Sequence, residues 1–157
     1  MGAFEYRQAE EIRDVLARHG VRYLFIGKSG AIILGYPDTT QDADIFPDRT
    51  PENGRALAEG LRELGFSLAG TEIAEIERGK DFVQLKNGPF DLDLIFAPDG
   101  IERFDYAWSR RVIVDGFPVC HPDDIIASKA AANRAKDREG LDRLRSFRDY
   151  WKKKRGA

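Results

Sequence analysis

The stretch of residues 23–35 constrains the fold more than any other part of the sequence. Four apolar residues, 23–26, run without a break into Gly-Lys-Ser at 27–29, and further apolar residues follow up to Gly35. The first run predicts a buried strand, and the second predicts a short buried helix. Gly-Lys-Ser also ends the phosphate-binding P-loop, but the glycine that opens such a loop would have to stand where Arg22 is. We therefore exclude a P-loop and expect a strand that passes directly into a helix.

The other elements follow from hydrophobic spacing and from helix and turn signals. Apolar residues three and four apart predict an amphipathic helix over 5–19, and Pro51 and Gly65 mark the two ends of another helix. Asn-Gly at 87–88 and Asp-Gly at 115–116 are hairpin-turn signals. The predicted elements are helix 5–19, strand 22–26, helix 29–35, strand 40–46, helix 51–65, a hairpin of strands 81–86 and 90–96, a second hairpin over 111–120, and helix from 122 onward, broken near Gly140.

This order of elements predicts the fold class. Strands that follow one another as hairpins argue against a doubly wound parallel sheet. We predict an α/β (α+β) protein in which helices pack on one mixed β-sheet. At 157 residues the chain suits a single domain over 1–157, with a core of about 21–120 and C-terminal helices of about 122–154.

Composition narrows the class of protein. The formal net charge is −2, so overall charge favours neither a nucleic-acid binder nor a membrane-surface protein. No apolar run approaches the ~18 residues of a membrane span, and no signal-peptide pattern is present. We therefore expect a cytoplasmic protein without a membrane partner. The single cysteine, Cys120, has no neighbours at zinc-ligand spacing and is expected to be a structural thiol.

Two Asp-x-Asp pairs carry the candidate chemistry. Residues two apart on a strand face the same way, so Asp42 projects with Asp44, and Asp91 projects with Asp93. Carboxylates are poor strand formers, and like charges side by side are unfavourable unless a cation lies between them. Carboxylate oxygens are ligands of Mg²⁺, and two metals held in this way activate an attacking hydroxyl and neutralise a leaving pyrophosphate. The alternative is that these acids are solvated on a half-exposed sheet.

The turn at 27–29 is a candidate anion site. A strand that runs straight into a helix places backbone N–H groups, the Ser29 hydroxyl and the Lys28 ammonium at a helix N-terminus, where anions bind favourably. The alternative for Lys28 is a solvated loop lysine.

Together these motifs resemble the nucleotidyltransferase superfamily with the DNA polymerase beta-like fold. The family pattern is an apolar strand, a Gly-Gly or Gly-Ser turn, a short helix, a strand of the form h-[DE]-h-[DE]-h and a third acid on a later strand. Residues 25–46 and 90–96 match this pattern in order and spacing. More narrowly, residues 35–48 and 121–144 look like the AbiEii-like or minimal nucleotidyltransferases, which carry Ser-Lys and Arg-x-Lys-Asp on C-terminal helices.

The resemblance implies roles for individual residues. Asp42 and Asp44 become catalytic acids and metal ligands, and Mg²⁺ or Mn²⁺ becomes the cofactor. Asp93 becomes the third acid, with Asp91 as the open alternative on the same strand face. For Lys136 and Asp137, pairing on a charged helix face is an equal alternative. The implied nucleotide-binding residues are Gly27, Lys28, Ser29, Lys129, Lys136 and Asp137, with Lys28 at a position where the family usually has Gly or Ser.

The implied activity is metal-dependent transfer of a nucleoside monophosphate from a nucleoside triphosphate to an acceptor. The first expectation for the acceptor is RNA or a tRNA end, in a toxin–antitoxin or phage-defence setting. The rival is an aminoglycoside or lincosamide antibiotic. The third hypothesis is a non-catalytic module that binds a nucleotide or a partner, such as an antitoxin with its cognate toxin. The basic tail 143–155, with Phe147, Tyr150 and Trp151, would either grip a phosphate backbone or cover the core.

Overall fold

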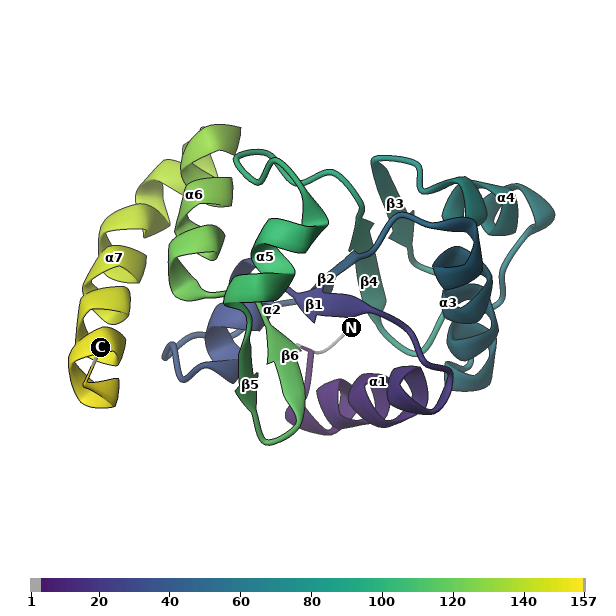
Figure 1. Cartoon of the computed structure of the whole chain (residues 1–157), viewed down its shortest axis with the longest axis horizontal. Coiled ribbons are helices and arrows are strands. Elements are labelled where there is room, and N and C mark those ends of the chain that lie inside the picture. Colours follow the sequence, from purple (N-terminus) through teal and green to yellow (C-terminus); the bar gives the residue numbers. More distant parts are fainter. Residues whose placement is uncertain (1–3, 157) are drawn as a thin grey trace.

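The computed structural model describes residues 4–156, in which helices pack on a mixed sheet (Figure 1). The predicted mixed sheet with helices is confirmed. The helices are α1 (Tyr6–Arg18), α2 (Gly27–Ile33), α3 (Pro51–Leu64), α4 (Gly70–Arg78), α5 (Phe104–Arg110), α6 (Pro122–Ala132) and α7 (Ala135–Arg155). The strands are β1 (Tyr23–Phe25), β2 (Asp42–Pro47), β3 (Phe82–Leu85), β4 (Asp91–Ile95), β5 (Val112–Val114) and β6 (Phe117–Val119).

The sheet has six strands in the order β3-β4-β2-β1-β6-β5. Both predicted hairpins form, because β3 pairs antiparallel with β4, and β5 pairs antiparallel with β6. Asp115 and Gly116 have φ of 49° and 79°, the left-handed values that a tight two-residue hairpin turn requires. The two strands with Asp-x-Asp, β2 and β4, lie side by side and run parallel.

The helices gather at opposite ends of the sheet. In Figure 1, α6 and α7 lie at one end of the molecule and α3 and α4 at the other. One cluster of buried apolar side chains joins these parts, with Ile12 and Leu16 from α1 and Leu144 and Trp151 from α7 among its members. Helix α7 is therefore packed into the core. Within residues 4–156, no helix is long and apolar enough to cross a membrane.

The strand that passes directly into a helix is confirmed. Strand β1 ends at Phe25, Ile26 is the N-cap residue, and α2 begins at Gly27. Gly30 of α2 lies against the strand so closely that an added Cβ would meet the Phe25 carbonyl oxygen at 3.0 Å. Helix α2 therefore sits directly on the sheet beside β2.

Three sequence predictions need correction. Helices α4 and α5 were not predicted, because both are short and neither N-cap residue accepts a side-chain capping bond. The C-terminal helices break at Asn133, which takes φ of 52° as the left-handed cap of α6, whereas Gly140 lies inside α7. The β3–β4 loop spans residues 86–90 instead of the predicted 87–89.

Candidate active site

Strands β2 and β4 bring the two Asp-x-Asp pairs together. In their parallel register Asp42 is opposite Asp91, and Asp44 is opposite Asp93. Three of these acids, Asp42, Asp44 and Asp93, line a cavity of about 630 Å³, whereas Asp91 is not among the residues that line it. The structure thus separates Asp93 from Asp91, which the sequence left as alternatives.

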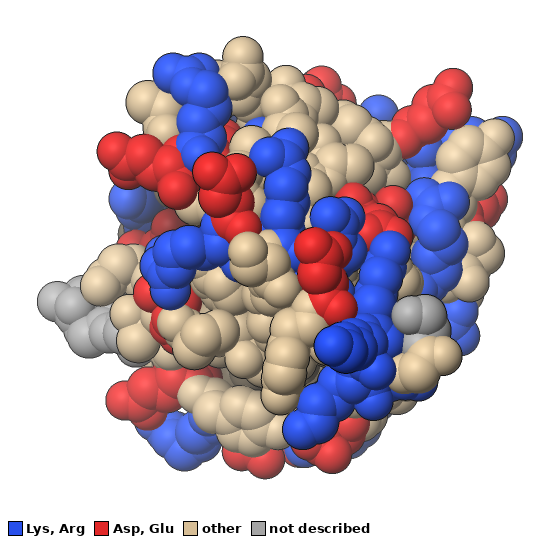
Figure 2. Space-filling model, turned by 90° about the vertical axis from the view of Figure 1, so that its left-hand side faces the viewer, with Lys and Arg blue, Asp and Glu red and all other residues tan. Residues whose placement is uncertain are grey.

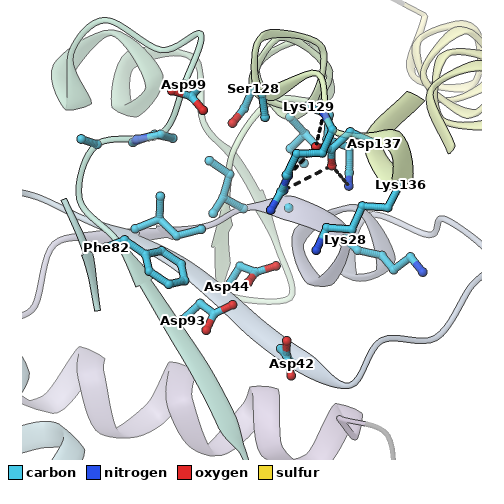
Figure 3. A pocket seen from close by; sticks show the side chains of 18 of the residues that line it. Lys28, Asp42, Asp44, Phe82, Asp93, Asp99, Ser128, Lys129, Lys136 and Asp137 are labelled. Carbon is cyan, nitrogen blue, oxygen red and sulfur yellow. Dashed lines mark hydrogen bonds and ion pairs between the residues drawn. The ribbon is translucent and has the colours of Figure 1, made fainter. Parts of the chain in front are cut away.

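The carboxyl groups of Asp44 and Asp93 are close enough to share a hydrogen bond, and Asp42 lies apart from them along β2 (Figure 3). Two of the three acids that line the cavity therefore meet, and the third, Asp42, lies two residues earlier on β2. Among the described residues, no group of three or more His, Cys, Asp or Glu side chains is arranged to hold a metal ion.

Burial makes this pair of acids unusual. Asp93 is only 8% exposed, and its Oδ1 atom is buried without a hydrogen-bond partner. Burial is the main cause that raises the pKa of Asp44, and the negative charge of Asp93 raises it further. Burial likewise raises the pKa of Asp93, with a contribution from the charge of Asp42. A buried carboxyl with an orphaned oxygen, Asp93, beside the half-buried carboxyl of Asp44 forms the hard oxygen donor set that a divalent cation fits.

Gly27 and Ser29 hold α2 against this pair. Gly27 has φ of +66°, and an added Cβ would meet the Asp44 Oδ2 atom at 2.5 Å, so a glycine is needed on both counts. The Ser29 hydroxyl accepts a hydrogen bond from the Asp44 backbone N–H at 2.9 Å and donates one to the Ile26 carbonyl at 3.1 Å. Ser29 is 2% exposed and does not line the cavity. Its hydroxyl therefore fixes the Asp44 backbone, and its role in a phosphate-binding turn stays a prediction.

Three lysines line the cavity opposite the acids. They come from separate elements: Lys28 from α2, Lys129 from α6 and Lys136 from α7. Figure 3 shows them gathered on one side, with Phe82 on the other side and Asp44 and Asp93 between. We call Lys28, Lys129 and Lys136 the lysine wall. Lys28 thus belongs to the cavity as well as being part of the turn.

Asp137 forms ion pairs with two cations on the lysine side of the cavity. Its carboxylate is 1% exposed, accepts a 2.7 Å hydrogen bond from the Arg134 Nε–H, and lies 3.7 Å from the Lys129 ammonium. Arg134 also lines the cavity, but it was not among the predicted site residues although it opens the Arg-x-Lys-Asp motif. A buried carboxylate surrounded by cations would repel phosphate. Asp137 is therefore placed to orient Lys129 and Arg134, and not to contact a nucleotide phosphate itself.

The far side of the cavity was not predicted from sequence. It is formed by Asp81, Phe82 and Gln84 at the edge strand β3, which we call the β3 wall, and by residues 97–99. Phe82 is 48% exposed, and the Asp81 carboxylate is bonded to the Arg49 guanidinium at 2.8 Å. The alternation of Phe82 and Gln84 with buried neighbours was the signal that marked them as outward-facing.

The basic tail divides between two roles. Trp151 is buried against the ring of His121, and Phe147 packs against Tyr36. Tyr150 is exposed. Two of these three aromatic residues therefore cover the core. Cys120 is fully buried, as expected of a structural thiol, and burial raises the pKa of its thiol.

Comparison with known proteins bears on the fold. No protein-family model matches the sequence, and no curated protein sequence matches it. Among solved structures, the chain is similar to the lincomycin-bound crystal structure of the lincosamide antibiotic adenylyltransferase LnuA. The TM-score is 0.66 at 15% sequence identity, and the match covers 93% of this chain and 99% of that chain. The chain therefore has the nucleotidyltransferase fold that its motifs resemble, whereas the narrower AbiEii-like resemblance stays a prediction.

Proposed function

We propose that the protein transfers a nucleotidyl group from a nucleoside triphosphate to an acceptor hydroxyl and releases pyrophosphate. One observation carries the proposal: within a nucleotidyltransferase fold, the paired carboxyls of Asp44 and Asp93 and a wall of three lysines line the same cavity. Carboxyls and lysines so placed suit the two ends of a metal-bound triphosphate. Neither set of charges is required by the hydrophobic core.

The acids fit a divalent cation, which we propose to be Mg²⁺ or Mn²⁺. Asp44 and Asp93 would hold it, with Asp42 as a further ligand from the same strand face. The support is the orphaned Oδ1 atom of Asp93 and the cost of placing two ionised carboxylates side by side without a counter-charge. When bound, such a cation polarises the phosphate and lowers the charge repulsion that an attacking oxygen meets.

The lysine wall would bind the β- and γ-phosphates. In the transfer, a bond forms between the acceptor oxygen and the α-phosphorus, and the bond from the α-phosphorus to the bridging oxygen breaks. Pyrophosphate leaves with that electron pair, and the proton of the acceptor hydroxyl passes to solvent. Lysines act as point charges that bind the negative oxygens of these phosphates, in the nucleotide as much as in the departing pyrophosphate. Asp137 keeps Lys129 in place, and Gly27 lets α2 approach Asp44.

For the acceptor, a small hydroxyl compound is better supported than RNA. The attacking oxygen must approach from the side opposite to the leaving pyrophosphate, which is the side of the β3 wall. That side, together with residues 97–99, lines the cavity with Phe82, Gln84, Asp81 and Asp99, and Arg49, the arginine beside it, is paired with Asp81. Such a surface disfavours a polyanion. LnuA, of the same fold, is named as a lincosamide adenylyltransferase and was crystallised with lincomycin.

A direct transfer assay tests the proposal. The protein is incubated with each labelled nucleoside triphosphate and Mg²⁺, with lincomycin, an aminoglycoside or total RNA as the acceptor. We expect label on a small acceptor and an equal amount of pyrophosphate, both lost in EDTA and in Asp44→Asn. Label on RNA alone would overturn the choice of acceptor. No nucleotide binding and no transfer under any condition would overturn the proposed function. A cognate toxin or antitoxin partner stays a prediction.

A further inference from the structure

A second cavity lies behind the lysine wall. Its volume is about 310 Å³, and it shares Lys28, Lys129 and Lys136 with the first cavity. The lysine wall is therefore a partition with a space on each side of it. The carboxylates of Asp44 and Asp93 line only the first space. The other residues that line the second cavity are Tyr36, Asp38, Glu139, Gly140, Arg143 and Leu144.

The second cavity carries an excess of positive charge. Four of its lining residues are cations, the lysine wall and Arg143, and two are acids, Asp38 and Glu139. Seen from the side on which α7 lies, Lys and Arg side chains crowd this face of the molecule, with Asp and Glu between them (Figure 2). A concave site of this charge suits a small anion with several negative oxygens.

One ion pair joins a lysine shared by both cavities to an acid that lines only the second. The Asp38 Oδ2 atom lies 3.1 Å from the Lys28 ammonium and 4.0 Å from the Arg143 guanidinium. Asp38 lines only the second cavity, so Lys28 is drawn toward that side. The Asp38 carboxylate also accepts a 2.7 Å hydrogen bond from the Thr39 backbone N–H, which fixes its position. Asp38 thus competes with any phosphate for Lys28.

We propose that the second cavity is a binding site for inorganic pyrophosphate, in which Asp38 is a built-in competitor that speeds its release. The inference rests on the proposed function for its setting, since an in-line transfer expels pyrophosphate on the side of the lysine wall, away from the acceptor. The three lysines are shared with the second cavity, which Arg143 also lines, so the anion meets further cations there. As the anion leaves, the Asp38 carboxylate forms its ion pair with Lys28 again.

Direct binding of pyrophosphate tests this without any need for catalysis. Calorimetry with inorganic pyrophosphate compares wild type with Asp38→Asn, Arg143→Gln and the control Arg145→Gln. Arg145 is a half-exposed cation on the same helix that pairs only with Asp142 and does not line the cavity. We expect Asp38→Asn to lower the Kd about five-fold and Arg143→Gln to raise it about five-fold, as about 1 kcal/mol predicts. Arg145→Gln should match wild type.

The gain in affinity is the decisive result, because a misfolded variant cannot bind more tightly. Equal affinity of wild type, Asp38→Asn and Arg143→Gln for pyrophosphate would overturn the proposal, as would equal losses in Arg143→Gln and Arg145→Gln. If the Kd values follow the expected order but no nucleotide is transferred to any acceptor, the anion site stands and the proposed function is wrong. If nucleotide is transferred but the Kd values do not follow this order, the proposed function stands and the second site is wrong.

Discussion

The two ends of helix α6 both carry acids and cations, but they pair them differently. At its N-terminal end, Asp123 accepts hydrogen bonds from Arg148 at 3.0 Å and Lys152 at 2.8 Å. Asp124 accepts two hydrogen bonds of 3.0 Å from Arg110. Every carboxylate here is saturated by the chain itself. We call this group, Asp123, Asp124, Arg110, Arg148 and Lys152, the clasp.

At the C-terminal end of α6 the pairing is incomplete. Lys129 lies 3.7 Å from Asp137, which already binds Arg134 more closely. Lys136 forms no ion pair with any described residue, and across the cavity Asp93 has an oxygen without a partner. Charges that satisfy each other hold a fold together, whereas cations and acids kept apart across a cavity suit a ligand that bridges them. The two ends should therefore respond to substitution in opposite ways.

The largest expected effect is loss of transfer in Asp44→Asn. The amide keeps the side-chain volume but removes a charge that the proposed cation needs, so kcat should fall on the order of 100-fold or more. Stability should stay equal or rise, because a buried charge beside Asp93 is removed. Steady-state kinetics and a melting curve measure both. A non-catalytic module would show unchanged nucleotide binding in this variant.

The clasp should show the reverse pattern. Asp124→Asn leaves the Arg110 guanidinium facing a poorer acceptor at a site where the Asp124 side chain is only 10% exposed, and it should lower the free energy of unfolding by about 2 kcal/mol. The KM for nucleotide should not change. Urea denaturation gives the comparison, with Asp142→Asn, a fully solvated acid on α7, as the control that should match wild type. A large loss of transfer in a folded Asp124→Asn would contradict this division of roles.

Part of the candidate site could be predicted from the sequence. The pattern of Asp in alternate positions of apolar strands predicted the two acid pairs, because side chains alternate across a sheet whatever surrounds them. The strand running into α2 was visible because nothing but a buried strand explains residues 23–26. Local chemistry was enough in both cases.

Other features depend on packing that brings distant residues together. The alternation of side chains along a strand places Asp91 and Asp93 on one face. Which of them lines the cavity depends on where α2, α6 and α7 pack, and in the structure it is Asp93. The role of Ser29 depends on the position of the Asp44 backbone, fifteen residues away. The helix break was placed at Gly140 because glycine is the stronger general signal, but Asn133 takes the left-handed conformation. The β3 wall had no motif of its own.

The pH dependence of the free energy of unfolding should report on the protonation of Asp44 beside Asp93. Burial and the charge of Asp93 raise the pKa of Asp44 to about 8 from its ordinary value of 3.8. The protonated form is thus favoured in the folded state, and its stabilising contribution is complete below pH 4 and lost as pH rises to about 8. In EDTA, wild type should lose stability relative to Asp44→Asn over this range, and saturating Mg²⁺ should reduce the loss. Parallel stability curves for the two proteins from pH 4 to 8 would contradict the raised pKa.

The smallest effect should separate the lysine wall from the clasp through a matched pair of lysines on α7. Lys136 has no partner in the described chain and lines the cavity, whereas Lys152 binds Asp123 at 2.8 Å. Lys136→Gln should raise the KM for the metal-bound nucleotide several-fold, because one exposed charge on a phosphate contributes about 1 kcal/mol, and it should leave kcat and the melting temperature nearly unchanged. Lys152→Gln should lower the melting temperature by a few degrees and leave KM unchanged. The KM effect of Lys136→Gln should also shrink at high salt, because exposed charges are screened. If the two variants had the same effect on KM, the two ends of α6 would not differ in function, however differently their charges are paired.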